Sequence, residues 1–207
     1  MSETAIQPLG RDQLEPAFAL ATEVFIAGSN VHRALGIGLE AYRAYLRPSF
    51  EAMVAEGLSF AATDAATGAL AGCVIVTDFS KTGTAPARRD PALAPLIALT
   101  DALGSKYPRA LGAGEAILVD MACVAEGYTG RGLYTALRGA AQDHAARRGF
   151  RWALGELSSA ATQHVILGKM GHRALARVDF ATFEFNGQRP FASITKPRGL
   201  VLSEGAL

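Results

Sequence analysis

The sequence predicts an α/β domain in which helices pack on a mixed β-sheet. Apolar residues recur at steps of three and four in some segments, as in amphipathic helices, and form short β-prone runs in others. The two kinds of segment alternate through the second half of the chain. The chain has 207 residues, of which 50% are hydrophobic, so it can bury a sizeable core. We expect a single domain over residues 1–207.

The N-terminal part predicts a short strand and two helices. Residues 4 to 8 form the strand, and Asp12 begins a helix with apolar residues at Leu14, Phe18, Ala21 and Phe25. Residues 26 to 37 contain two glycines and several polar residues, so we predict a loop. The second helix contains Pro48, which should kink or divide it. Its inward residues are Tyr42, Tyr45, Leu46, Met53 and Val54.

The middle of the chain predicts a hairpin and a long connection. Residues 58 to 64 and 70 to 77 are β-prone runs, and Gly68 between them suits a tight turn. Residues 79 to 114 are rich in glycine and proline and form an insertion before the fourth strand, with one short helix around 92 to 103. A connection of this length is usually functional or mobile.

The second half predicts strands and helices in alternation, followed by a second hairpin. The strands are 115 to 124 and 150 to 156, and the helices are 132 to 148 and 159 to 170. Asn186 and Gly187 form a strong turn signal between predicted strands at 174 to 185 and 189 to 195.

The amino-acid composition limits the kinds of binding partner and the cellular location that we expect for the protein. Lys and Arg number 20 and Asp and Glu 19, so nothing demands a nucleic acid or an anionic membrane as partner. Cys73 and Cys123 lie in apolar runs and are expected to be buried thiols in a reducing cytoplasm. We expect no signal peptide, and no apolar run approaches the ~18 residues of a transmembrane helix.

The segment from Val124 to Leu137 joins a predicted buried strand to a predicted helix through Ala-Glu-Gly-Tyr-Thr-Gly-Arg-Gly. Glycines let a ligand approach the backbone, and the N–H groups and dipole of a helix N-terminus favour an anion. Arg131 adds a positive charge, so a phosphate or pyrophosphate is the natural ligand. A plain strand-to-helix connection has the same local pattern. A dinucleotide-binding turn usually follows the first strand of its domain, and a P-loop would contain Gly-Lys-Ser or Gly-Lys-Thr.

This segment resembles the acetyl-CoA signature of the GNAT N-acetyltransferase superfamily, Arg/Gln-x-x-Gly-x-Gly/Ala after the fourth strand. The positions that fit its longer form are Val124, Tyr128, Gly130, Gly132 and Leu133. Thr129 stands where Arg or Gln is usual, and Tyr134 stands where Gly or Ala is usual. The order of elements over about residues 4 to 195 is also similar to the superfamily. The insertion and the N-terminal helix pair resemble its arylalkylamine N-acetyltransferase-like branch.

The resemblance implies a mixed, mostly antiparallel sheet of about seven strands, flanked by helices and splayed between strands four and five. It implies an enzyme that transfers the acetyl group of acetyl-CoA to a primary amine, which we expect to be a small molecule, and it implies no metal. The coenzyme-binding residues that it implies are Ala122, Cys123, Val124, Tyr128, Thr129, Gly130, Arg131, Gly132, Leu133 and Tyr134. The connections 26 to 36 and 79 to 113 are expected to wall the acceptor pocket.

Asp120 is the candidate base that deprotonates the amine. It lies in an otherwise apolar strand four residues before Val124, so alternation predicts both side chains on one face. The alternative is a structural Asp bonded to backbone N–H groups at a strand bulge. The superfamily commonly has a Tyr general acid on the last helix, where this chain has Leu167. His164, one turn earlier, is the candidate acid, and Tyr134, Ser159 and water are other donors.

Two alternatives to an acetyltransferase stay open. One is a catalytically degenerate acyl-CoA-binding sensor, which Thr129, Tyr134 and Leu167 favour. The other is an acyltransferase that uses a longer acyl-CoA. The sequence leaves open whether the chain pairs with a second copy as a homodimer. No pair of its histidines has the spacing of metal ligands.

Overall fold

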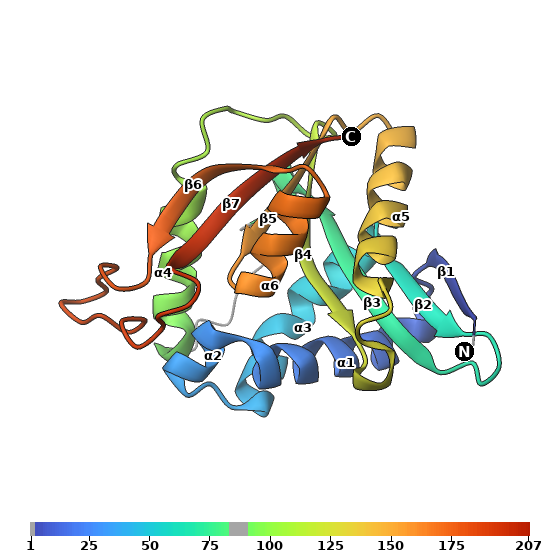
Figure 1. Ribbon diagram of the computed structural model, residues 1–207, viewed down its shortest axis with the longest axis horizontal. Helices are drawn as coiled ribbons and strands as arrows, with labels where there is room; N and C mark the ends of the chain where they lie inside the picture. The colour runs from blue at the N-terminus through green and yellow to red at the C-terminus, as the bar shows by residue number, and fades with distance from the viewer. Residues whose placement is uncertain (1–2, 83–90) are drawn as a thin grey trace.

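The computed structural model describes residues 3–82 and 91–207. Seven strands form one sheet in the order β1-β2-β3-β4-β5-β7-β6, in which only β4 and β5 are parallel neighbours (Figure 1). The strands are β1 Thr4–Pro8, β2 Phe60–Asp64, β3 Leu70–Asp78, β4 Ala116–Val124, β5 Trp152–Leu157, β6 Arg173–Asp179 and β7 Gly199–Ala206. The predicted mixed, mostly antiparallel sheet is confirmed.

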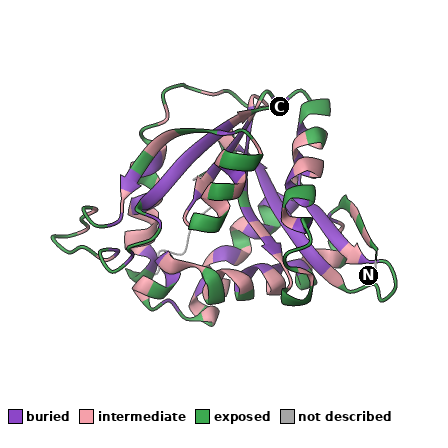
Figure 2. Ribbon diagram, in the orientation of Figure 1, coloured by how far each residue is buried: buried purple, intermediate pink, exposed green. Residues whose placement is uncertain are grey.

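Helices cover both faces of this sheet. The longer ones are α1 Leu14–Gly28, α3 Leu39–Ala55, α4 Ala94–Gly104 and α5 Leu133–Arg147. The shorter ones are η1 Arg11–Gln13, α2 Asn30–Leu35, η2 Phe79–Lys81, η3 Pro91–Leu93, η4 Glu126–Tyr128, α6 Ala160–Gln163 and the π-helical η5 His164–Lys169. Strands β2, β3, β4, β5 and β7 are buried along most of their length, whereas the edge strands β1 and β6 and the outer faces of the helices are more exposed (Figure 2).

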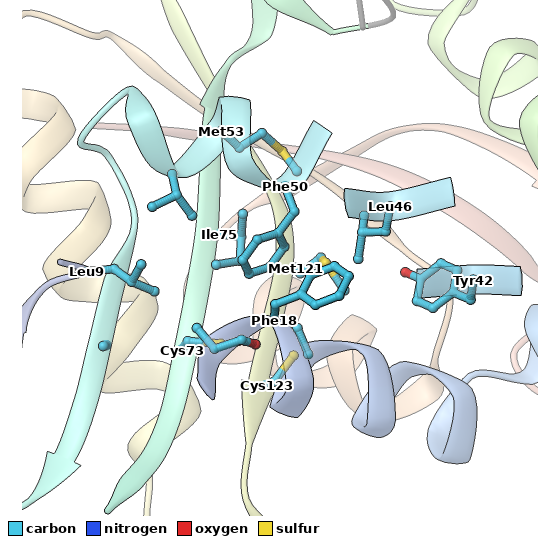
Figure 3. Packing of buried hydrophobic residues seen from close by; sticks show 14 of the residues in the cluster. Leu9, Phe18, Tyr42, Leu46, Phe50, Met53, Cys73, Ile75, Met121 and Cys123 are labelled. Atoms are coloured by element: carbon cyan, nitrogen blue, oxygen red, sulfur yellow. The ribbon is translucent and has the colours of Figure 1, made fainter. Parts of the chain in front are cut away.

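The two faces of the sheet carry separate apolar clusters. Helices α1 and α3 cover β3 and β4 on one face, where Phe18 and Phe50 meet edge to face at 5.2 Å and pack with Met121 (Figure 3). Helix α5 covers β2, β3 and β4 on the other face through Leu133, Leu137 and neighbouring alanines. Helix α4 packs against β6 and β7. From Met121 onward, the residues of β4 therefore point alternately toward α1 and α3 and toward α5.

The two parallel strands β4 and β5 separate halfway along their length. They pair only from Ala116–Trp152 to Val119–Gly155. Beyond that point β4 still pairs with β3 as far as Val124, and β5 still pairs with β7 as far as Leu157. The ends of β4 and β5 therefore have no sheet partner on the sides that face each other. The expected splay between strands four and five is confirmed.

Several predictions about local structure were wrong. Residues 26 to 37 are mostly helical, because α1 extends to Gly28 and α2 follows after one residue. Pro48 does not divide α3, which buried Leu46 and Phe50 hold against the core on either side of it. The helix predicted over 159 to 170 is present, but it is α-helical only in α6 and continues as the π-helical η5.

The last predicted hairpin was also wrong. Asn186 and Gly187 do form a turn with positive φ, but it closes only the isolated bridge between Phe185 and Gln188. The strand that pairs with β6 is β7, after the predicted partner. Of the predicted insertion 79 to 114, residues 83–90 lie outside the described residues, and its predicted helix is α4. In the described ranges, no helix is long and apolar enough to cross a membrane.

Candidate active site

The glycine-rich turn after β4 is held open against the β2–β3 hairpin. Tyr128 donates a hydrogen bond to Asp64 Oδ2 at 2.8 Å, and the other oxygen of Asp64 accepts from Ala66 N in the hairpin turn at 2.9 Å. Gly130 and Gly132 have φ of 74° and 76°, which side chains with a Cβ atom rarely adopt. A Cβ atom added at either would meet no atom within 4 Å, so the space above the turn is open.

The start of α5 presents unused hydrogen-bond donors to that space. Across the described chain, the backbone N–H groups from Gly130 to Thr135 form no hydrogen bond, and Ala136 N is the first to bond back into the helix, at 3.0 Å. A cavity of about 230 Å³ lies here, lined by Val124, Tyr128, Thr129, Gly130, Gly132, Leu133 and Tyr134. Free N–H groups, a helix dipole and the exposed Arg131 suit an anionic ligand.

A second hollow lies elsewhere in the described part of the chain. It has about 300 Å³ and lies between α2 and residues 193 to 196. Asn30, Arg33 and Ala34 of the predicted wall 26 to 36 line it, but none of the predicted catalytic or coenzyme-binding residues does. We place the candidate site at the smaller cavity because the free N–H groups and the gap between β4 and β5 converge there.

Asp120 lies at a β-bulge, which changes the face it points to. Met121 pairs with Ile75 and Val119 pairs with Val76, so Asp120 has no partner residue on β3. Its charge acts on Tyr42 and Tyr45 of α3, which places its side chain toward that helix. Val124 packs instead in the cluster under α5. The prediction that Asp120 and Val124 share a face was therefore wrong, because the bulge inserts an extra residue between them.

The electrostatic setting of Asp120 fits a group that can exchange a proton. Desolvation by the surrounding protein raises the pKa of its carboxyl group to about 6, although the side chain is exposed to water. A raised pKa and an exposed side chain occur together when neighbouring elements enclose a carboxylate but leave an opening through which water reaches it. The carboxylate forms no hydrogen bond or ion pair with any residue in 3–82 or 91–207. In the alternative role, Asp120 would accept hydrogen bonds from backbone N–H groups at the bulge. No such bond is present among the described residues.

Glu156 of β5 is a second acidic residue at the gap, and it was not among the residues predicted from the sequence. It is half-buried, and burial first, then the charges of Asp120 and Asp101, raise its pKa to about 8. It forms no hydrogen bond or ion pair within the described ranges. The sequence signal that could have identified Glu156 is its position as a charged residue at the end of a predicted buried strand. Asp120 and Asp101 of α4 thus place negative charge on the face toward α3 and α4, and Glu156 beside them is mostly protonated at neutral pH.

Arg138 of α5 places a positive charge on the opposite face. It is 2% exposed, and its Nε and Nη2 atoms have no hydrogen-bond partner among the described residues. Its Nη1 donates to Tyr134 Oη at 3.4 Å. A Cβ atom added to Gly155 would lie 3.4 Å from Nη2, so the guanidinium lies against β5 where β4 departs. Burial lowers the pKa of Arg138, but a guanidinium remains protonated at neutral pH.

The other predicted donors lie farther from the cavity. His164 is exposed at the start of η5 and does not line the cavity. Ser159 caps α6, where its hydroxyl oxygen accepts from Thr162 N at 3.1 Å. Leu167 packs with Tyr134, Leu157 and Ile166 in one apolar cluster. Of the predicted coenzyme residues on β4, Ala122 and Val124 are half-buried beside the gap, and Cys123 is buried on the other face.

The two cysteines lie on neighbouring strands as free thiols. Cys73 and Cys123 are both buried and directly opposite each other on β3 and β4, as Figure 3 shows. The prediction of two buried thiols is confirmed. Within residues 3–82 and 91–207, no group of three or more His, Cys, Asp or Glu side chains is placed to hold a metal ion.

Comparison with known proteins identifies the fold. No protein-family model and no curated protein matches the sequence. The structure matches the C-terminal condensation domain of Ebony in complex with beta-alanyl-dopamine, with TM-score 0.87, 14% identity and 100% of each chain covered. It matches arylalkylamine N-acetyltransferase 2 from Aedes aegypti with TM-score 0.76, 13% identity and 99% of each chain covered. It matches the polyamine N-acetyltransferase of Drosophila melanogaster with TM-score 0.70, 13% identity and coverage of 99% of this chain and 100% of that one.

At these identities the likeness shows the fold. The chain has the GNAT fold, and the resemblance to the arylalkylamine N-acetyltransferase-like branch is confirmed at the level of structure. The gap between β4 and β5, the glycine-rich turn and the two acidic residues all lie within this fold.

Proposed function

We propose that the protein is an N-acyltransferase that transfers the acetyl group of acetyl-CoA to the primary amine of a small molecule. The observation that carries this proposal is the gap between β4 and β5, which has an anion-binding turn on one side and unpaired carboxylates on the other. An anionic acyl donor and a cationic acceptor can therefore reach the same gap from opposite faces. The arylalkylamine and polyamine acetyltransferases of similar structure act on amines by their names.

The residues present fit the coenzyme. The free N–H groups from Gly130 to Thr135 would hold the pyrophosphate, with Arg131 adding charge and Tyr128 fixing the turn through Asp64. The unpaired edge of β4 at Ala122, Cys123 and Val124 offers backbone groups to the pantetheine arm. When bound, acetyl-CoA supplies an activated acetyl thioester.

The carboxylates fit a cationic amine. Asp120 raises the pKa of Glu156 across the gap, and neither side chain has a cation partner in the described chain. An ammonium group there would offset the charge of Asp120 and favour ionisation of Glu156. Free alkylamines are protonated at neutral pH and must lose a proton before they attack. Asp120, with a pKa raised to about 6, is the base that takes this proton.

The chain would contribute position and charge to the remaining steps. The turn and the carboxylates hold the two reactants at one gap, which can supply much of the acceleration. A strand N–H at or near Val124 would stabilise negative charge on the carbonyl oxygen. For the proton that the sulfur takes up, the sequence indicated His164, whose exposed ring could act only through water.

A second candidate is an acyltransferase that uses an acyl group larger than acetyl. The condensation domain of Ebony, with TM-score 0.87, is in complex with beta-alanyl-dopamine, an amine that carries an aminoacyl group. The cavity of about 230 Å³ is smaller than most sites for a whole ligand, and Tyr134 lines it where the GNAT signature has Gly or Ala. Both facts leave room for a donor other than acetyl-CoA.

An acceptor screen separates these candidates. The purified chain is incubated with acetyl-CoA or β-alanyl-CoA and a library of arylalkylamines, polyamines and amino acids, and free thiol is measured. Thiol release that depends on a particular amine identifies the acceptor, and the preferred donor distinguishes the two candidates. Binding of acetyl-CoA by calorimetry without turnover on any acceptor would instead indicate a sensor. Failure to bind either donor at millimolar concentration would refute both transferase proposals.

We further propose that the protein works in the cytoplasm, since its two cysteines are free thiols rather than a disulfide. Whether the chain forms a homodimer would be decided by analytical ultracentrifugation of the purified protein.

A further inference from the structure

The buried guanidinium of Arg138 has no partner that explains it. An unpaired charge inside a protein costs free energy. Replacing it with an apolar group of similar size usually leaves the stability of the protein unchanged or increases it. Arg138 is 2% exposed, two of its nitrogen atoms lack any hydrogen bond among the described residues, and its one contact is Tyr134 Oη at 3.4 Å. Its position therefore indicates an anion that is present only during function.

The place where that anion would lie follows from the neighbours of Arg138. Its Nη2 lies against Gly155, which forms the last pair of the parallel ladder with Val119. Tyr134, which accepts its hydrogen bond, lines the cavity together with Val124 and Gly132. The pair Tyr134–Arg138 therefore connects the cavity with the point at which β4 and β5 part. Arg138 lies six residues after Gly132, so more than one helical turn separates it from the glycine turn that we propose for the phosphates.

We propose that Tyr134, with Arg138 behind its hydroxyl, donates the proton that the leaving sulfur of the acyl donor takes up. This inference rests on the proposed acyl transfer. As the nitrogen of the amine bonds to the carbonyl carbon, the carbon–sulfur bond breaks and the sulfur keeps the bonding pair. Tyr134 Oη gives its proton to that sulfur. Arg138 stabilises the negative charge first as it develops on the sulfur and then on the phenolate, until water returns a proton to Tyr134, and the amide and the free thiol leave.

The surroundings of Tyr134 suit this role. Its ring packs with Leu157, Ile166 and Leu167, so apolar groups shield it from bulk water, which strengthens the effect of the Arg138 charge. Two departures from the GNAT signature thus lie side by side. Leu167 stands where a donor is usual, and Tyr134 supplies a hydroxyl to the same cluster from α5.

The charged and titratable groups that face Arg138 do not neutralise it. His172 is buried near it, and burial together with the Arg138 charge lowers the pKa of His172 to about 4, so its ring is neutral at physiological pH. His172 Nε2 lies 3.1 Å from the Gln142 amide nitrogen. Ser203 of β7 donates to Gly155 O at 3.2 Å and so does not bond to Arg138. Glu156 belongs to the face toward α3 and α4, where Asp120 and Asp101 raise its pKa.

Turnover of Tyr134→Phe is the first measurement. The variant keeps the ring and removes the hydroxyl, so acyl-CoA affinity by calorimetry should stay within about twofold of wild type. Turnover with the best amine of the screen should fall by at least about tenfold. The decline of rate at high pH that a general acid produces should also disappear. Equal turnover and an unchanged pH profile would overturn the proposal, as would faster turnover with tighter binding, which would show that the ring only obstructs the coenzyme.

The thiol of bound CoA gives a readout that does not depend on activity. The ultraviolet absorbance of the thiolate is followed against pH for CoA bound to wild type and to Arg138→Met. If the Arg138 charge stabilises the sulfur anion, the thiol of CoA should titrate roughly one pH unit lower on wild type than on Arg138→Met. Because Arg138 is unpaired, the variant should fold with an unchanged or higher Tm. Identical titration on a folded variant would overturn the proposal.

The two levels of inference fail in different ways. If wild type binds no acyl-CoA, the proposed function and this inference both fail. If wild type binds and turns over but Tyr134→Phe and Arg138→Met behave as wild type does, acyl transfer stands and only the role of the pair is refuted.

Discussion

Glu156→Gln should make the protein more stable at high pH and leave it unchanged at low pH. Burial and two neighbouring carboxylates raise the pKa of Glu156 from 4.5 to about 8, so the folded chain favours its protonated form. For an acid with a raised pKa, the stability is fully present below about pH 4.5 and is lost as the pH rises through about 8. Glutamine keeps the shape of the protonated acid and cannot ionise, so the variant should escape this loss.

The size of the effect follows from the same values. A rise of the pKa from 4.5 to about 8 corresponds to at most about 5 kcal/mol of lost stability. Water that reaches the half-buried side chain reduces this to about 2 to 3 kcal/mol. In a domain of this length each kcal/mol moves Tm by about 2 to 4 °C, so we expect the variant to melt about 4 to 12 °C above wild type near pH 9.

Thermal unfolding followed by circular dichroism between about pH 4.5 and pH 9 measures this difference. The matched control is Glu126→Gln, which changes an exposed glutamate with no ion pair in the described chain and should leave Tm unchanged at every pH. Asp120→Asn should shrink the pH dependence of wild type, because it removes one of the charges that raise the pKa of Glu156. A Tm difference that is constant with pH, or a wild type more stable than Glu156→Gln near pH 9, would refute the reasoning.

Three further results are expected. Asp120→Asn should lower turnover by roughly 10²-fold at neutral pH with little change in acetyl-CoA affinity, and the deficit should shrink at high pH, where free amine is abundant; equal turnover across pH 6 to 10 would remove Asp120 from the mechanism. Gly132→Glu should abolish acetyl-CoA binding in calorimetry, whereas Gly132→Asn, which tolerates φ of 76° better, should retain part of it; equal loss in both would point to backbone strain rather than charge. Amide hydrogen exchange of residues 26 to 36 and of α4 should slow when acceptor binds, because α4 contributes Asp101 to the charged face; unchanged exchange in both segments would place the acceptor elsewhere.

The parts of the fold that the sequence predicted well are those with local causes. The β2–β3 hairpin depends on Gly68, whose φ is 72°, between two β-prone runs. The turn before α5 depends on Gly130 and Gly132, which are needed for their positive φ wherever the rest of the chain lies. Turn glycines of this kind are recognised from the residues next to them, so pattern analysis can identify the turns without the tertiary structure.

The failures come from pairings that adjacent residues do not determine. Asn186 and Gly187 form the turn that they predict, but the partner of β6 is chosen by the sheet, where β7 inserts between β5 and β6. The bulge at Asp120 depends on the register in which β4 pairs with β3. The single extra residue reverses which face of the sheet each later side chain of β4 points to. Periodicity within β4 could not show this.

The candidate site could be found from the sequence only in part, for the same reason. The glycine-rich turn is a contiguous motif, so its residues could be named from the sequence as candidates for coenzyme binding. The partners of Asp120 come from β5, α3 and α4, and Glu156 acquires its significance only when the gap brings it beside Asp120. Arg138 falls on the buried side of α5, where its neighbours Leu137 and Ala141 are core residues, and only the structure shows that its charge is unpaired.

The unpaired charges on the two faces of the sheet are best understood together. Asp120 and Glu156 lie on the face toward α3 and α4, and Arg138 lies on the face toward α5, so the backbone of β4 and β5 keeps them from forming an ion pair. Each is destabilising in the free chain, and core packing on both faces tolerates the loss. In the proposed acyl transfer this separation would be useful, since a carboxylate on one face can hold and deprotonate the amine while a positive group opposite stabilises the departing sulfur. A chain that only sensed acyl-CoA would have no use for the acidic face. Binding of amines that Asp120→Asn and Glu156→Gln weaken, and that Arg138→Met leaves unchanged, would therefore favour an enzyme over a sensor.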